Sequence, residues 1–183
     1  IYQAFLSQMP PSESSCIKGL GREMIIYRHL KNNLGIPVTG VHLPECGGST
    51  GVLLISIQKQ TRFQPLKAMM GAWSLHDVFG KMTIVVDEDI DILDPTQVEW
   101  ALSFRMQPAE DVHIIKGTDP LTLDPSQPLL FGEKVKPSEQ VSSKVGIDAT
   151  RKHSYPALAV PPKEDLEKVD ARWESYGIQE VTA

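Results

Sequence analysis

Residues 81–106, KMTIVVDEDIDILDPTQVEWALSFRM, predict a strand, a turn and a helix in direct succession. The segment 82–86 is apolar and largely β-branched, which is typical of a strand buried on both faces. Asp94 is placed to cap the helix, and Pro95 stands at its first position. The apolar face of this helix is expected to contain Val98, Ala101, Leu102 and Arg105, widened by Trp100 and Phe104. A strand followed by a helix in this way indicates an α/β domain.

Helices are also expected on both sides of this unit. Ser12 can cap a helix that runs to about Asn33 and stops at Gly35. Another helix follows Thr61, and a last one starts at Pro161. Apolar residues at helical spacing mark the first helix (Ile17, Leu20, Met24, Tyr27, Leu30, Leu34), the second (Leu66, Met69, Met70, Trp73) and the last (Leu166, Val169, Trp173, Tyr176).

Four further segments are interpreted as strands, namely 38–43, 52–57, 112–115 and, in part, 141–152. The first two are adjacent and joined by a Gly-rich loop, so they can form a hairpin. Between 118 and 139 prolines interrupt the pattern, and no regular element is expected there. The predicted fold class is therefore α/β: a mixed β-sheet flanked by helices, in a single domain over 1–183 that ends in a C-terminal helix.

Length, charge and cysteine content exclude several classes of protein. A chain of 183 residues is long enough for one domain with a sizeable core. The net charge of −5 argues against nucleic acid as a partner, and no apolar run reaches the roughly 18 residues of a membrane span. Cys16 and Cys46 lack metal-ligand spacing, which favours a reducing compartment and a cytoplasmic location. Because the sequence opens on Ile1, we expect a processed, cleaved or trimmed product.

The acidic cluster after the central strand has two interpretations. Carboxylates at the end of a buried strand are able to hold Mg²⁺ or Mn²⁺ for phosphoryl or glycosyl transfer. A solvated turn followed by a helix cap explains the same residues, and we favour it. The histidines have no partner at helical spacing, and no self-sufficient catalytic set is found. The cluster consists of Asp87, Glu88, Asp89, Asp91 and Asp94.

Three blocks, 69–112, 121–126 (LTLDPS) and 142–152 (SSKVGIDATRK), together resemble the C-terminal part of the UbiD family of prenylated-flavin-dependent decarboxylases and carboxylases. The similarity extends over essentially the whole chain. It implies a parent enzyme that reversibly decarboxylates aromatic, heteroaromatic or α,β-unsaturated acids with prenylated FMN, Mn²⁺ and K⁺. In this family the catalytic residues and the flavin and metal ligands lie in a preceding domain. The resemblance therefore implies no catalytic residue and no metal ligand in this chain, and an inactive fragment.

The resemblance also implies what the chain contributes to such an enzyme. The C-terminal part of the family assembles subunits into a homo-oligomer and closes against a flavin-binding domain of the same or a partner chain. By the same resemblance, substrate-pocket residues are expected at Ser14, Lys18, Ile147 and Ala149.

Two alternatives stay open: a non-catalytic oligomerisation or interaction subunit, and a metal-dependent transferase that uses Asp87, Glu88 and Asp89. For the polar residues near Ile147 we favour a structural salt-bridge set. That set comprises Lys144, Asp148, Arg151 and Lys152.

Overall fold

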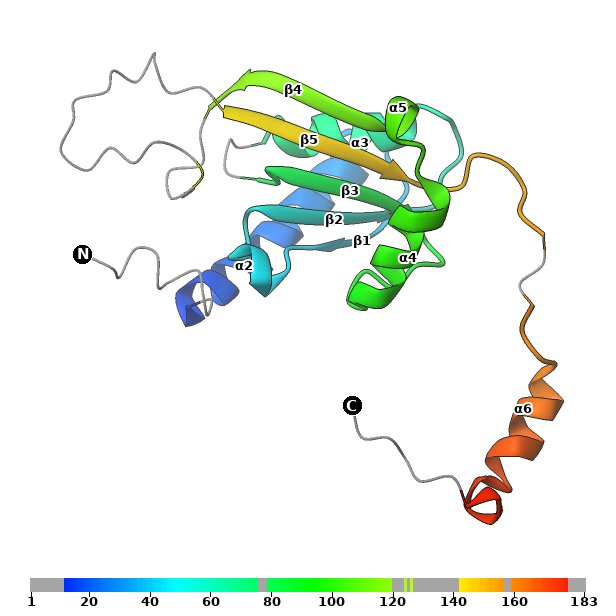
Figure 1. Cartoon of the computed structure of the whole chain (residues 1–183). Coiled ribbons are helices and arrows are strands. Elements are labelled where there is room, and N and C mark those ends of the chain that lie inside the picture. The colour runs from blue at the N-terminus through cyan, green and yellow to red at the C-terminus, as the bar shows by residue number, and fades with distance from the viewer. Residues whose placement is uncertain are drawn as a thin grey trace. The chain divides into compact units, whose positions relative to one another are not determined.

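The computed structural model describes residues 12–75, 79–119, 124, 126, 142–156 and 159–177 (Figure 1). Ile1–Lys152 and His153–Ala183 form two separate compact units. The described part of the first unit contains the sheet and the helices that cover it, and the described part of the second contains one short helix and a 3₁₀ turn. Among the described residues, no helix is both long enough and apolar enough to cross a membrane.

In the described part of the first unit, five strands form one mixed sheet in the order β1–β2–β3–β5–β4. β1 and β2 are an antiparallel hairpin, β2, β3 and β5 run parallel, and β4 is antiparallel to β5. The predicted hairpin and the predicted α/β class with a mixed sheet are therefore confirmed. The strands are β1 (Val38–His42), β2 (Val52–Ile57), β3 (Met82–Asp87), β4 (Val112–Thr118) and β5 (Ser142–Ala149).

The first described helix, α2 (Glu13–Arg28), begins where the sequence predicts. Ser12 Oγ accepts a hydrogen bond from the backbone N–H of Ser15 at 3.3 Å, which satisfies a free amide of the first turn. The helix continues as a π-helical turn, η1 (His29–Asn33). Gly35 follows shortly after this end, with a φ of +64°, a conformation that glycine adopts without strain. Both predicted ends of this helix are confirmed.

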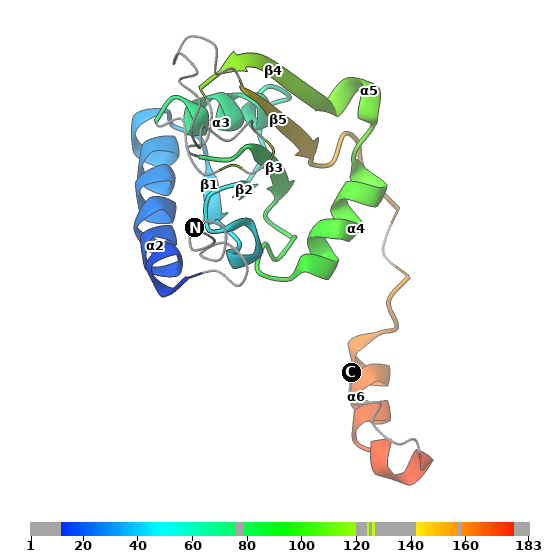
Figure 2. The same cartoon turned by 60° about the vertical axis from the view of Figure 1, so that its left-hand side comes forward.

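One face of the sheet is covered by α2 and by α3 (Gln64–Trp73), as Figure 2 shows. Ile26 of α2 and Leu30 of η1 are fully buried there, and so is Met69 of α3. Because neighbouring residues of a strand point to opposite faces, β2 contributes Leu53 and Ile55 to this core. The other members of this core cluster are Ile36, Val38, Leu43, Ile57, Ala68, Ala72, Phe79 and Val85.

Gly71 of α3 lies where two helices approach closely, and it offers a matched test of this packing. A Cβ at Gly71 would lie 2.4 Å from Leu34 Cδ1, whereas a Cβ at Gly21 of α2 would meet no atom within 4 Å. Both alanine substitutions gain helix propensity, about 1 kcal/mol each. We expect Gly21→Ala to raise the free energy of unfolding by this amount and Gly71→Ala to lower it by about 1–3 kcal/mol, as measured by urea unfolding. Equal stabilisation by both changes would show that Leu34 gives way without cost.

The opposite face of the sheet is covered in part by α4 (Pro95–Arg105). Asp94 Oδ1 accepts from Thr96 N–H at 2.9 Å, so the predicted cap is confirmed. A second core lies under this helix, and its buried members are Leu54, Ile84, Val86, Ile90, Val98, Ala101 and Ala149. A one-turn helix, α5 (Pro108–Asp111), then leads into β4.

Three of the predicted apolar faces are wrong in part, because each helix packs through a narrower stripe than the sequence suggests. In α3, Met69 is fully buried but Met70 of the predicted face is 55% exposed. In the first helix, the predicted face holds at its end, where Leu30 of η1 is fully buried, but Ile17, Leu20 and Met24 are 65–71% exposed. The fully buried residue of α2 is Ile26, which lies outside the predicted face. In α4, Val98, Ala101 and Arg105 are buried, whereas Trp100 and Phe104 are 36% and 67% exposed and contact each other, with ring centroids 5.7 Å apart.

The second unit contains α6 (Lys163–Asp170), followed by a 3₁₀ turn, η4 (Trp173–Tyr176). The prolines that precede α6 start the helix as predicted, and Gly177, with a φ of +64°, follows the turn. The predicted apolar stripe is present but uncovered. Its members are Leu166, Val169, Trp173 and Tyr176, which are 39–49% exposed.

Candidate functional site

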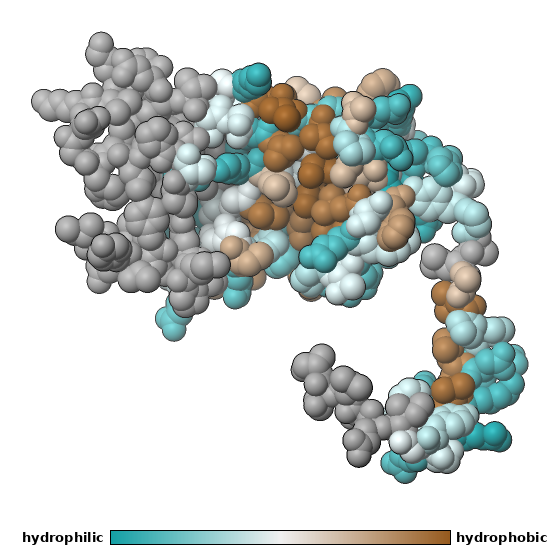
Figure 3. All heavy atoms as spheres, in the orientation of Figure 1, coloured by the Kyte–Doolittle hydropathy of each residue, from teal (hydrophilic) through white to brown (hydrophobic). Residues whose placement is uncertain are grey.

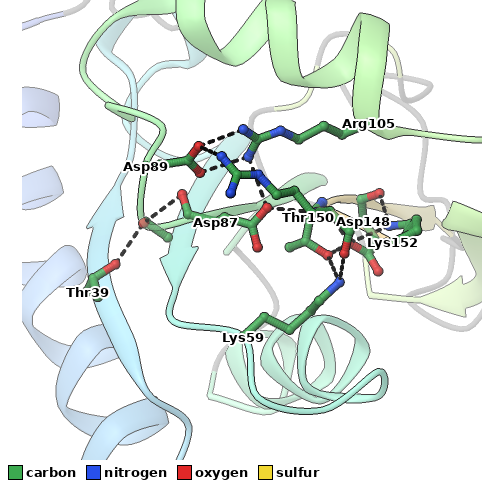
Figure 4. A network of polar contacts seen from close by, with 10 residues as sticks. Thr39, Lys59, Asp87, Asp89, Arg105, Asp148, Thr150 and Lys152 are labelled. Carbon is green, nitrogen blue, oxygen red and sulfur yellow. Dashed lines mark hydrogen bonds and ion pairs between the residues drawn. The ribbon is translucent and has the colours of Figure 1, made fainter. Parts of the chain in front are cut away.

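Two aspartates and two arginines meet where the parallel strands end (Figure 4). Asp87 ends β3, Asp89 follows in the turn, and Arg105 ends α4. Arg105 Nη1 donates to Asp87 Oδ2 and Asp89 Oδ1, both at 2.9 Å, and its Nη2 donates to Asp89 Oδ2 at 2.7 Å. Arg151 donates its backbone N–H to Asp87 Oδ2 at 2.7 Å, and its guanidinium pairs with Asp89. This cluster ties α4 and the segment after β5 to the end of β3.

The electrostatics of the cluster favour the charged forms. The hydrogen bond from Arg105 is the main reason why the pKa of Asp89 is lowered, partial burial opposes it, and the positive charges of Arg105 and Arg151 add to the lowering. Arg105 is only 3% exposed, and its guanidinium carbon lies 5.0 Å from the ring centroid of Trp100. The guanidinium is therefore enclosed between two carboxylates and an aromatic ring.

Two other carboxylates of the acidic cluster, Asp91 and Asp94, accept hydrogen bonds from nearby main-chain amides, which supports the turn and helix-cap interpretation. Asp91 Oδ1 accepts from Leu93 N–H at 2.9 Å, and Asp94 caps α4. In the described ranges, no group of three or more His, Cys, Asp or Glu side chains is arranged to hold a metal ion. The carboxylates of Asp87 and Asp89 are bound by arginines, which is not the donor set of Mg²⁺ or Mn²⁺. The described residues thus do not fit the metal that the resemblance implies.

A second polar group lies beside the first, at the carboxyl end of β5 (Figure 4). Thr150 Oγ1 donates to Asp148 Oδ1 at 2.5 Å and accepts from Lys59 Nζ at 2.8 Å. Lys152 Nζ lies 2.8 Å from Asp148 Oδ1 and 3.1 Å from Asp111 Oδ1. These contacts join the ends of β2 and β5 to α5.

The salt-bridge interpretation of the residues near Ile147 is confirmed for Asp148, Arg151 and Lys152. Asp148 and Lys152 pair with each other, and Arg151 pairs with Asp89. Lys144, which is buried in β5, donates to the main-chain carbonyl of Phe79 at 2.8 Å.

The four predicted pocket residues do not come together within this chain. Ser14 and Lys18 are exposed in the first turns of α2, on the face of the sheet that α2 and α3 cover. Ile147 and Ala149 point to the opposite face, in the core under α4. Their assignment to one substrate pocket stays a prediction.

Register places Ile147 and Ala149 in different rows across the sheet. The outer row, at the amino ends of the parallel strands, consists of Val52, Met82, Val145 and Ile114. Ile147 belongs to the next row, where it pairs with Ile84 and Val112. Ala149 pairs with Val86 in the third row and is fully buried among residues of α4. The side chains on this face are thus covered by α4 most fully in the third row and least in the outer row.

The outer row leaves part of this face apolar and open. Ile114 is 64% exposed and Met82 is 38% exposed, while Val52 and Val145 are half-buried. Figure 3 shows apolar side chains gathered over the strands on this face. Exposed apolar surface of this kind marks a site of interaction with another protein surface or a ligand.

The amino end of α2 is held near the same end of the sheet. Arg22 Nη1 donates to Thr50 Oγ1 at 2.7 Å and to the carbonyl of Ser49 at 3.2 Å, just before β2 begins. A Cβ at Gly19 would lie 2.8 Å from Ser49 Cβ, so the helix and this turn are in close contact. Ser14 and Lys18 therefore lie in the same helical segment that is anchored beside the start of β2.

Comparison with known proteins identifies the family to which this chain is similar. Residues 15–149 match the model of the 3-octaprenyl-4-hydroxybenzoate carboxy-lyase C-terminal domain, UbiD_C. An uncharacterized protein of Aeropyrum pernix is 31% identical to this chain, and the match covers 97% of this chain and 36% of that protein.

Solved structures agree with this match. The UbiD-class enzyme HmfF from Pelotomaculum thermopropionicum, in complex with FMN, is similar with a TM-score of 0.70 and 28% identity over 86% of this chain and 34% of its own. Vanillic acid decarboxylase from Sedimentibacter hydroxybenzoicus, in its open form, is similar with a TM-score of 0.61 and 25% identity over 86% of this chain and 33% of its own. The chain spans about a third of the length of these relatives. Because the family model covers well over half of its residues, the chain belongs to the UbiD_C family, the C-terminal domain of UbiD-class decarboxylases.

Proposed function

We propose that this chain acts as the C-terminal domain of a decarboxylase of aromatic, heteroaromatic or α,β-unsaturated acids, in which it closes against a flavin-binding domain. That domain lies in the same protein or in a partner chain. HmfF, which is similar over this region, has been solved with FMN and, in an evolved dimeric form, with prFMN. Vanillic acid decarboxylase has been solved in open and closed forms, which supports a closing movement in the class.

The observation that carries this proposal is the open outer row of the sheet. Four apolar side chains from four strands form a continuous strip, of which Ile114 and Met82 are 64% and 38% exposed and the other two half-buried. Exposure of an apolar strip to water is unfavourable in free energy, and covering the strip with another surface is favourable. Covering by a flavin-binding domain would exclude water from the space between the two, which a decarboxylation that passes through a carbanion-like state requires.

The four proposed pocket residues differ in how they lie relative to this strip. Ile147 lies one row further in and is still half-buried, so it is the residue of the four that borders the strip directly. Ser14 and Lys18 are exposed in the first turns of α2, which covers the other face of the sheet. Ala149, under α4, supports Ile147 rather than facing the strip.

The chemistry itself is assigned to the flavin-binding domain. Prenylated FMN, when bound there with Mn²⁺ and K⁺, would supply the covalent chemistry of the decarboxylation. By this proposal the residues of this chain contribute shape, an apolar cover and an anchored helix, and the acid–base residues and metal ligands belong to the flavin-binding domain. By this proposal the chain alone has no decarboxylase activity, even when the cofactor and both ions are added.

Assembly into a homo-oligomer is the second part of the proposal. The stripe of α6 and η4 is uncovered, and a second copy of the chain would bury it. If no flavin-binding domain accompanies this chain in its natural protein, the alternative of a non-catalytic oligomerisation subunit is favoured instead.

The outer row can be tested with Ile114→Asp in the protein that contains the flavin-binding domain. A carboxylate in a surface that becomes covered loses its water without gaining a partner. We expect kcat/KM for decarboxylation to fall by about 10- to 100-fold, which corresponds to roughly 1.4–2.7 kcal/mol. The melting temperature of the 183-residue chain should hardly change, because Ile114 is already 64% exposed there.

Phe104→Asp is the matched control, since Phe104 is equally exposed, at 67%, but belongs to α4 and not to the outer row. This variant is expected to retain activity within about a factor of three. Full activity of Ile114→Asp, or an equal loss in both variants, would mean that the outer row is not the closing surface.

A further inference from the structure

A cavity of about 610 Å³ opens at the carboxyl ends of β2 and β5, beside the start of α3. It lies at the opposite end of the parallel strands from the outer row. In open α/β sheets, the crevice beyond the carboxyl ends of the strands is where ligands bind. Its lining combines four cations and two apolar side chains (Lys59, Arg62, Phe63, Leu66, Arg151 and Lys152) with three carboxylates (Glu110, Asp111 and Asp148).

Lys59 differs from the other cations of the cavity in its partners. Its ammonium donates to Thr150 Oγ1 at 2.8 Å and to the main-chain carbonyl of Arg151. In the part of the chain that the structure describes, no carboxylate lies within 4.0 Å of it, whereas Lys152 pairs with Asp148 and Asp111. A charged amine with two neutral acceptors lacks a direct counter-ion.

The surroundings make this positive charge costly. Burial lowers the pKa of Lys59, and the charge of Lys152 adds to the lowering, while Asp148, Asp87 and Asp111 oppose it. An anion in the cavity would offset this cost, because it would provide the opposite charge that no side chain provides at contact distance.

The wall of the cavity next to Lys59 combines a second cation with an apolar surface. Arg62 is 3.8 Å from Glu110, but both side chains are largely exposed, at 86% and 72%, so this ion pair is weak and its guanidinium remains available. Phe63 is 75% exposed at the start of α3, and Leu66 lines the cavity one turn further on. An exposed aromatic ring beside a cation suits a flat apolar body that carries a negative group.

We propose that this cavity binds a small aromatic carboxylate, with the carboxylate at Lys59 and Arg62 and the ring against Phe63. The inference does not depend on the closing role of the outer row, because it concerns residues of the chain alone. Its ligand is defined by two features together, a monovalent oxyanion and a planar apolar body.

Benzoate is the probe, titrated into the 183-residue chain and followed by amide chemical shifts and by calorimetry. We expect saturable binding with shifts confined to the lining residues, and a rise in the titration midpoint of the Lys59 side-chain signal when benzoate is bound. Inorganic phosphate and cyclohexanecarboxylate should each bind several-fold more weakly, since one lacks the ring and the other lacks its flat face. Phosphate that binds as tightly as benzoate would overturn the aromatic part of the proposal.

Three variants locate the site. Lys59→Met and Phe63→Ala should each weaken benzoate binding by about tenfold or more. Lys163→Met removes the same charge from the second unit, where the side chain is 89% exposed, and should leave binding unchanged. If Lys59→Met proves unstable, Arg62→Ala replaces it, because Arg62 is 86% exposed and its removal should not disturb the fold. Binding that is absent in the parent chain, or unaffected by Phe63→Ala and Arg62→Ala, overturns the inference.

Discussion

We expect Arg105→Met to lower the free energy of unfolding by about 3–5 kcal/mol. The change leaves the partly buried carboxylates of Asp87 and Asp89 without their main partner. Asp87 and Asp89 each accept from the Arg105 guanidinium at 2.7–2.9 Å, and Arg105 is almost fully buried. Methionine keeps most of the apolar stem, so the loss reports on charge and hydrogen bonds more than on volume. Urea unfolding at neutral pH measures it.

The loss caused by Arg105→Met should depend on pH in a defined direction. The pKa of Asp89 in the folded protein is lowered from its ordinary value of 3.8, chiefly by the Arg105 hydrogen bond. A lowered folded pKa contributes stability that is present above the unfolded pKa and is lost as pH falls through the folded pKa. The difference between parent and variant should therefore be full above about pH 5 and shrink as pH falls below 3.8.

Arg62→Met is the control, since it breaks an exposed ion pair with Glu110 at 3.8 Å. Its effect on unfolding is expected to stay within about 0.5 kcal/mol at every pH. A variant at Arg105 that is as stable as the parent would show that desolvation of the cluster cancels its attraction, as happens in some buried ion pairs.

Much of the secondary structure follows from local sequence. The β-branched run of β3, the Asp94 cap with Pro95, and Gly35 after the first helix each act within a few residues, so the element bounds can be predicted from them. Which stripe of a helix is buried is a different question, because it depends on the surface that the helix meets. The apolar run of α2 that contains Ile17, Leu20 and Met24 looks like a core face in the sequence but is exposed in this chain.

The polar cluster could be predicted only in part. An arginine at helical spacing with Val98 and Ala101 is on a face expected to be buried, and a buried arginine needs an acidic partner. That signal was available, but the partner, Asp89, is 16 residues away from Arg105 and depends on how α4 folds back on β3. The lining of the cavity near Lys59 comes from the ends of β2 and β5 and from α3 and α5, so no local pattern contains it.

The stripe of α6 and η4 should make the chain self-associate, with Trp173 as its strongest contributor. A helix of eight residues is only marginally stable by itself in water, so its persistence requires that Leu166, Val169, Trp173 and Tyr176 pack against something. We expect a dimer in sedimentation and light scattering. Trp173→Ala should weaken it by about 30- to 1,000-fold, or roughly 2–4 kcal/mol, which is the range of a central aromatic contact.

Leu93→Ala serves as the control. Leu93 is 69% exposed and belongs to the first unit, so its substitution removes exposed apolar surface but leaves the stripe of α6 and η4 unchanged. It should leave the dissociation constant unchanged. If Met24→Ala in α2 weakens the dimer as much as Trp173→Ala does, the exposed face of α2 is part of the same interface, and the two apolar faces left uncovered in one chain are covered by a second copy. A chain that remains monomeric at high concentration would count against self-association, and a Trp173→Ala variant that dimerises as well as the parent would remove this stripe as its cause.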